Sequence, residues 1–342
     1  MLATFHCRKN YVVHLENLQY YLKKGLKLQK IHRVVRFRQK SFLKKFIEKI
    51  TDLRSKAKND FELRLFKLFA NSTFGKFIEN VRNYIEIKIC NTDESFRKIC
   101  LGQHVKTFKT INKNLVTVMK KPCKIKLNKP LAVGFAILEL SKLFMYRSYY
   151  DVFMPYFGSE NLSLCFSDTD SFLFQVKTDN LLKDLTNLRH LFDFSKYPQK
   201  HVLYDCSKAN HLFYFKDELC GKAAITHFIG LRPKCYSMQI KNYDETDTKT
   251  KKVCKGIKRT AIKNQLTYSD YEKCLNNQCH VYKSFRNFGS KNHKISTRFI
   301  RKIALSAIDT KRYTLNCGKH TLALGNCNIN KCKVAGECHK CE

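Results

Sequence analysis

The segment from Leu162 to Val176 constrains the fold of this chain most strongly, because two short apolar runs flank the polar turn Asp168-Thr-Asp170. This pattern predicts a β-hairpin with two carboxylates at its tip. Side chains at positions i and i+2 of an extended segment point to the same side, so we expect both carboxylates to converge. The two carboxylates repel each other, and a hard cation such as Mg²⁺ relieves that repulsion. The alternative is an ordinary turn rich in aspartate, since Asp is frequent in turns.

A second motif lies in a segment from about Asp52 to Val81 that is predicted to be helical. Four of its residues share one helical face, because their spacing is i, i+4, i+7 and i+8. They are Lys67, Asn71, Phe74 and Gly75. This face offers a cation for a polyphosphate, an amide, an aromatic edge, and a glycine that lets a flat group approach the backbone. Glycine inside a helix costs about 0.5–1 kcal/mol relative to alanine, which favours a functional reason over an incidental glycine in an amphipathic helix.

Together, these motifs resemble those of family B DNA polymerases, specifically the protein-primed branch. That family carries Lys-x-x-x-Asn-Ser-x-Tyr-Gly on its fingers helix and Tyr-x-Asp-Thr-Asp-Ser on its palm hairpin. Three later runs resemble the family's Lys-x-Tyr primer motif, its lysine-glycine entry to the thumb and its terminal Asp-Asp-Lys-Arg run. They are Leu231-Arg-Pro-Lys234-Cys-Tyr236, Lys251-Lys-Val-Cys-Lys255-Gly256 and Asp309-Thr-Lys311-Arg312-Tyr313. The likeness extends to the polymerases of Polinton/Maverick transposons and their viral relatives.

The resemblance implies two-metal phosphoryl transfer, in which a primer 3′-hydroxyl attacks the α-phosphorus of a deoxynucleoside triphosphate. Asp170 would be the main ligand of two Mg²⁺ ions, Asp168 would assist, and Lys67 would neutralise the triphosphate. The nucleotide-binding residues would be Lys67, Asn71, Phe74, Gly75 and Arg54. The DNA-binding residues would be Lys234, Tyr236, Lys252, Lys255, Lys311 and Arg312. The implied partners are a DNA primer-template, deoxynucleoside triphosphates and a terminal priming protein.

The first catalytic aspartate of the family lies in a palm strand that ends in Ser-Leu-Tyr-Pro-Ser, and no such string occurs in this sequence. We also expect no amino-terminal proofreading exonuclease, because Glu16 is the only acidic residue from Met1 to Lys24. The resemblance therefore predicts the carboxy-terminal half of a polymerase, which by itself would not extend a primer. The alternative is a non-catalytic DNA-binding remnant of a transposon polymerase.

The fold that the resemblance implies is a truncated right-hand polymerase of the α+β class, with an antiparallel palm sheet, helical fingers and a helical thumb. The expected divisions are an amino-terminal palm remnant over 1–40, fingers helices over 41–81, palm over 82–251 with a basic insertion at about 84–129, thumb over 252–316, and a cysteine-rich tail over 317–342. Local patterns predict helices over 16–24, 130–157 and 181–192, strands over 11–14, 27–37 and 201–240, and a basic hairpin over 106–129.

The charge balance favours a polynucleotide partner. Lysine and arginine number 65 against 28 acidic residues, which gives a net charge of +37. Such a charge favours phosphate backbones through counterion release. No run of about 18 apolar residues occurs, so we expect no membrane partner. The 16 cysteines follow no repeating spacing, which is typical of reduced thiols inside the cell, and the resemblance implies the nucleus or the site of transposon or viral replication.

The cysteine-rich tail is a candidate zinc site. Its cysteines are Cys327, Cys332, Cys338 and Cys341. Only Cys338-x-x-Cys341 has the spacing typical of a zinc hook, and the first pair is looser. The alternative is a frayed chain terminus without a metal.

Overall fold

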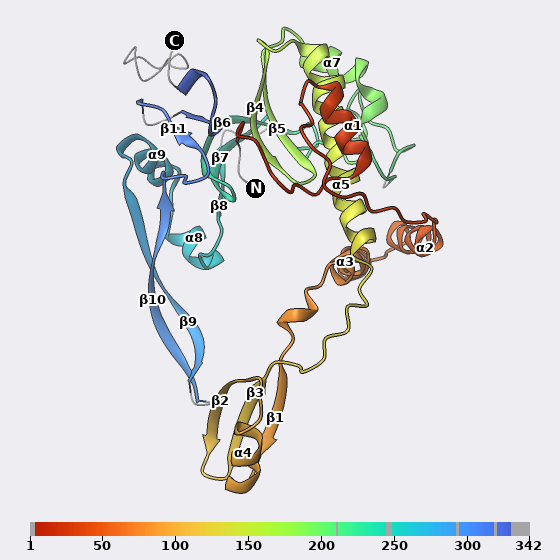
Figure 1. The fold of residues 1–342 in the computed structure, drawn as a ribbon. Helices are drawn as coiled ribbons and strands as arrows, with labels where there is room; N and C mark the ends of the chain where they lie inside the picture. Colours follow the sequence, from red (N-terminus) through yellow and green to blue (C-terminus); the bar gives the residue numbers. More distant parts are fainter. Residues whose placement is uncertain (1–3, 210, 244–247, 292–293, 318–319, 330–342) are drawn as a thin grey trace. The chain divides into compact units, whose positions relative to one another are not determined.

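The computed structural model describes residues 4–209, 211–243, 248–291, 294–317 and 320–329 (Figure 1). The chain divides into two compact units, and each is described by itself. Unit 1 comprises Met1–Val12, Arg147–Arg286 and Phe299–Glu342, and unit 2 comprises Val13–Tyr146 and Asn287–Arg298. Helices occur together with sheets, and the pairings of strands β1 to β8 are all antiparallel. The predicted α+β class is therefore confirmed.

In unit 2, helix α1 (Leu15–Lys23) lies within one residue of the prediction. Its Asn17 is fully buried and donates a hydrogen bond of 2.7 Å to the carbonyl of Glu139. The strands predicted over 11–14 and 27–37 are wrong. A strand needs a neighbour for its backbone hydrogen bonds, and no strand among the described residues pairs with either segment.

The helix pair predicted over 41–81 is confirmed as α2 (Lys44–Ser55) and α3 (Asp60–Phe77), which contact each other in unit 2. The start of α3 follows from its sequence. The side chain of Asn59 accepts a hydrogen bond of 2.9 Å from the backbone N–H of Glu62. An asparagine cap followed by acidic residues in the first turn favours a helix start at this point.

The basic insertion forms a three-stranded antiparallel sheet in the order β1-β3-β2. Its strands are β1 (Glu86–Cys90), β2 (Val105–Asn112) and β3 (Leu115–Lys120). Helix α4 (Asp93–Cys100), which the sequence patterns did not predict, lies against this sheet (Figure 1). The predicted hairpin is therefore right in type but ends at Lys120 and not at 129. Pro122 follows β3 closely and lacks the N–H that a longer strand would need.

The long helix predicted over 130–157 is confirmed as one uninterrupted helical run. It consists of α5 (Leu131–Arg147), the π-helical turn η2 (Ser148–Phe153) and α6 (Met154–Phe157). In unit 2, Gly134 of α5 is required by close packing, because a Cβ atom there would collide with the side chain of Ile78. Within the described ranges, no helix combines the length and the apolar character needed to cross a membrane.

In unit 1, the predicted acidic hairpin is confirmed as β4 (Leu162–Asp168) and β5 (Ser171–Val176). Helix α7 (Leu181–Asn187) and the 3₁₀ turn η3 (Arg189–Leu191) follow it, close to the predicted helix. The predicted single palm sheet is wrong, because the hairpin and the next three strands form separate sheets. Those strands are β6 (Ala223–Arg232), β7 (Cys235–Asn242) and β8 (Thr248–Cys254). They replace the strands predicted over 201–240.

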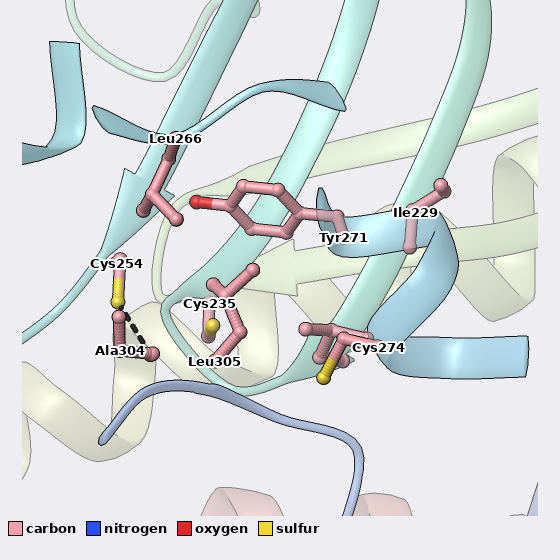
Figure 2. Close-up of a cluster of buried hydrophobic side chains, with 9 residues drawn as sticks. Ile229, Cys235, Cys254, Leu266, Tyr271, Cys274, Ala304 and Leu305 are labelled. Carbon is pink, nitrogen blue, oxygen red and sulfur yellow. Dashed lines mark hydrogen bonds between the residues drawn. The ribbon is translucent and has the colours of Figure 1, made fainter. Parts of the chain in front are cut away.

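The main core of unit 1 lies where α8 (Arg259–Gln265) and α9 (Tyr268–Asn277) contact the β6–β8 sheet (Figure 2). Tyr271 is fully buried there, and its hydroxyl donates a hydrogen bond of 3.2 Å to the carbonyl of Val253. Cys254 donates through its thiol to the carbonyl of Ala304 at 2.9 Å. These bonds satisfy polar groups that would otherwise be buried without a partner.

The prediction of a helical thumb is wrong for much of 252–316. After α8 and α9, the chain forms the long hairpin of β9 (His280–Lys291) and β10 (Lys294–Ser306). A short pair of strands, β11 (Tyr313–Thr314) and β12 (Thr321–Leu322), follows. The physical reason is composition, because β9 and β10 are rich in aromatic and β-branched residues, which favour strands. Their apolar residues, such as Val281, Phe285 and Phe288, follow helical spacing, so the periodicity does not reveal the strands.

Candidate active site

The tip of the β4–β5 hairpin is a tight turn. Asp168 pairs with Ser171 in the strand register, and Thr169 between the two aspartates has φ +60°. The backbone N–H of Asp170 donates to the carbonyl of Asp168 at 2.7 Å. The turn is therefore not extended, so the strand rule that places side chains i and i+2 on one side does not hold for the two carboxylates. Asp170 is exposed, whereas the side chain of Asp168 is 35% exposed.

An aromatic cluster supports the hairpin from within unit 1. Phe153 of η2 is almost completely buried, and its ring centroid lies 5.3 Å from that of Phe174 on β5. Phe172 stacks on Phe174 at 5.0 Å, and Phe215 lies 5.7 Å from Phe153. Because several rings fix β5, the backbone that carries the aspartates rests on a packed core.

Lys234 lies next to the hairpin tip. It occupies the turn between β6 and β7, and its ammonium nitrogen is 3.1 Å from Oδ2 of Asp168. Its carbonyl accepts a hydrogen bond of 3.0 Å from the backbone N–H of Lys255. The structure thus brings together two sequence motifs, the acidic hairpin and the Lys-x-Tyr run, that lie far apart along the chain.

Tyr236 belongs to the same neighbourhood. Its ring centroid is 4.7 Å from that of Phe166 on β4 and 5.9 Å from that of Phe228 on β6. Burial and the negative charge of Asp168 raise the pKa of Tyr236 above its ordinary value. The hydroxyl therefore keeps its proton at neutral pH and can donate a hydrogen bond.

The two aspartates offer hard oxygen ligands, and Mg²⁺ is usually bound through one or two carboxylates while it keeps several waters. This donor set fits Mg²⁺. Among the described residues, no group of three or more His, Cys, Asp or Glu side chains is arranged to hold a metal ion. Of the four zinc candidates, Cys327 is exposed, and Cys332, Cys338 and Cys341 lie outside the described residues.

The remaining predicted DNA-binding residues differ in their surroundings. Lys252 donates through its ammonium to the carbonyl of Lys263 at 3.0 Å, at the end of α8. Arg312 donates from Nε to the hydroxyl of Thr321 at 2.7 Å. Both side chains thus have structural contacts within unit 1. Lys255 and Lys311 are exposed.

The predicted nucleotide-binding face lies in unit 2. Lys67, Asn71 and Gly75 of α3 are exposed, and Phe74 is half-buried. A Cβ atom added to Gly75 would meet no atom within 4 Å, so the space above the glycine is open. Arg54 is exposed near the end of α2. The helical spacing does place the four α3 residues on one face.

The sequence patterns did not predict the hairpin of β9 and β10, which we call the β9–β10 arm. No acidic residue occurs between His280 and Ser306. Its basic residues are Lys283, Arg286, Lys291, Lys294, Arg298, Arg301 and Lys302. Phe288 and Phe299 are largely exposed on it, and the guanidinium of Arg301 lies 4.9 Å above the ring of Tyr282. The signal that could have revealed this arm is a long stretch without acids that is rich in aromatic and β-branched residues.

The sequence model of one protein family, described as DNA polymerase type B, organellar and viral, matches residues 3–137. The match includes the α3 motif and supports the resemblance to family B DNA polymerases. It supports a DNA polymerase function, which implies a DNA primer-template and deoxynucleoside triphosphates as partners. Neither a search of curated proteins nor a search of solved structures found a match.

Proposed function

We propose that this chain is the polymerase portion of a protein-primed family B DNA polymerase, of the kind carried by Polinton/Maverick transposons and related viruses. The reaction is template-directed addition of deoxynucleotides to a primer 3′-hydroxyl. The observation that carries the proposal is the 3.1 Å contact between Asp168 of the acidic hairpin and Lys234 of the Lys-x-Tyr run. The family match over residues 3–137, which contain the α3 motif, supports it independently.

In this proposal, Asp168 and Asp170 hold Mg²⁺ at the hairpin tip. The bound metal would activate the primer hydroxyl and stabilise charge on the leaving group. Lys67 pairs with the triphosphate, and the open space above Gly75 admits the flat nascent base pair. Tyr236 donates its hydroxyl proton in a hydrogen bond that orients the primer end.

The basic surfaces supply affinity for DNA that does not depend on sequence. The β9–β10 arm carries basic residues without acids, together with exposed aromatic rings such as Phe288 and Phe299. Cations bind phosphates, and aromatic rings stack on unpaired bases. We propose that this arm and the β1–β3 sheet hold the template and the displaced strand, and that a terminal protein provides the priming hydroxyl.

The test is primer extension with Mg²⁺ or Mn²⁺. We propose that residues 1–342 extend a primer only when a second polypeptide supplies the palm aspartate of the Ser-Leu-Tyr-Pro-Ser strand. The expected result is extension in the complemented reaction, which Asp170→Asn abolishes. Extension by residues 1–342 alone would contradict the need for that aspartate. A complemented reaction without extension, from a chain that still binds DNA, would favour the non-catalytic remnant.

A further inference from the structure

Lys234 has a backbone conformation that is uncommon for a residue with a side chain. Its φ is +60°, in the left-handed region that favours glycine. The hydrogen bond from the N–H of Lys255 to its carbonyl fixes this turn where β7 begins and β8 ends. A strained residue persists where the surrounding structure compensates for it, and such residues cluster at functional sites. At Lys234, the backbone hydrogen bond from Lys255 holds the turn, and the turn carries the ammonium to 3.1 Å from Asp168.

We infer that Lys234 couples cation binding at the hairpin to DNA binding by exchanging its ion-pair partner. Its ammonium pairs with Asp168 in the absence of DNA and passes to a backbone phosphate when a divalent cation occupies that carboxylate. Lys234 thus acts as a positioning residue whose two partners are alternatives. The inference rests on the proposed function, because it takes the hairpin to be the cation site.

The geometry makes the two cations competitors. The ammonium lies 3.1 Å from Oδ2 of Asp168 and so uses lone pairs that a divalent cation would coordinate. Two positive charges on one carboxylate repel each other. The exchange is also physically easy, since Lys234 is 50% exposed and Asp168 is 35% exposed. Ion pairs with this much exposure shift an equilibrium by only about 1.5- to 5-fold.

The exchange requires positive coupling between the two ligands. A cation on Asp168 frees the ammonium of Lys234 for a phosphate, and a phosphate on Lys234 frees Asp168 for the cation. By thermodynamic linkage, each ligand raises the affinity for the other by the same factor. A neutral residue at position 234 should therefore raise the cation affinity of the DNA-free chain and lower the coupling factor.

The experiment measures Mn²⁺ binding to the full chain by the electron paramagnetic resonance signal of free Mn²⁺, and duplex DNA affinity by fluorescence anisotropy with and without Mn²⁺. Lys234→Met should raise the Mn²⁺ affinity without DNA by about 1.5- to 5-fold and lower the coupling by the same factor. Lys234→Arg, which keeps the charge, should behave like the wild type. Lys241→Met removes an exposed lysine from β7, the strand that follows the turn of Lys234, and is the matched control.

Two outcomes separate the inference from the proposed function. If Lys234→Met leaves Mn²⁺ affinity unchanged while Asp168→Asn combined with Asp170→Asn removes binding, the exchange is refuted and the cation site stands. If the double substitution leaves Mn²⁺ binding unchanged, the hairpin is not the cation site and both ideas fail. Should Lys234→Met not fold, Lys234→Gly suits φ +60° and also lacks the ammonium.

Discussion

The acidic hairpin and helix α3 carry the two most informative motifs of this chain, and they are built in different ways. The hairpin rests on aromatic rings such as Phe153, which is 4% exposed, and Asp168 has a charged neighbour. In α3, which the structure describes throughout, no residue is buried. Its Phe61 and Phe69 are 70% and 45% exposed.

Under the proposed function, the difference follows from the ligand that each motif would bind. Ligands of a small hard cation must be held in place beforehand, because coordination tolerates little displacement. A helix face for a nucleotide must instead remain accessible, since the base and the triphosphate cover it only on binding. A packed core behind the hairpin and an open face on α3 are therefore the forms expected of the two proposed sites.

The largest expected effect concerns stability, and it compares the packed core behind the hairpin with the exposed surface of α3. Phe153→Ala removes the ring that contacts Phe174 and Phe215, so it should destabilise unit 1 by about 3–5 kcal/mol. Phe69→Ala on the exposed surface of α3 should cost less than about 1 kcal/mol. Urea unfolding with hydrogen exchange in each unit measures both. Equal costs would show that the hairpin is no better supported than α3.

The next effect concerns the cation. Replacing Asp168 and Asp170 by asparagine should weaken Mn²⁺ binding by roughly 100-fold or more, because the hairpin then has no anionic ligand. Asp179→Asn is the control, since it removes an exposed carboxylate beyond β5. Titration by paramagnetic relaxation of water protons measures the affinities. If the control and the double variant lost affinity equally, binding would be diffuse and not located at the hairpin.

The elements that were predicted correctly are specified by local patterns. The hairpin has alternating apolar residues around a polar turn, and α3 has helical spacing after an asparagine cap. The strand predicted over 27–37 has a local pattern too, but β structure depends on a neighbour, which a local pattern cannot supply. The β9–β10 arm was missed because its apolar residues follow helical spacing, such as Val281, Phe285 and Phe288, and this agreed with the helical thumb that the resemblance implied.

The side-chain partners of the candidate site were the least predictable part. The motifs named Asp168 and Lys234 separately, but their contact depends on how β4 and β6 pack together. Lys252 and Arg312 have the charge expected of DNA-binding residues. In the structure, their donors bond to the carbonyl of Lys263 and to the hydroxyl of Thr321. Such acceptors lie elsewhere in the chain, and a basic motif carries no information about them.

The third prediction concerns the cationic group on α3. Lys67→Ala should weaken binding of a deoxynucleoside triphosphate by about 10-fold, because a charged hydrogen bond to phosphate is lost. Lys76→Ala is the matched control on the same helix. Nine residues further along, Lys76 lies about 180° around the helix, where it pairs with Glu79 at 3.0 Å. A fluorescent nucleotide analogue measures both affinities, and equal losses would mean that this face has no special role.

The smallest expected effect separates the two explanations of Gly75. Because an added Cβ atom would meet nothing within 4 Å, Gly75→Ala should stabilise α3 by about 0.5–1 kcal/mol. If a flat base pair approaches this glycine, the same methyl group should also lower nucleotide affinity. Thr73→Ala, on the opposite side of α3, should leave nucleotide affinity unchanged. A Gly75→Ala variant that is more stable and binds nucleotide as well as the wild type would show that the glycine is incidental.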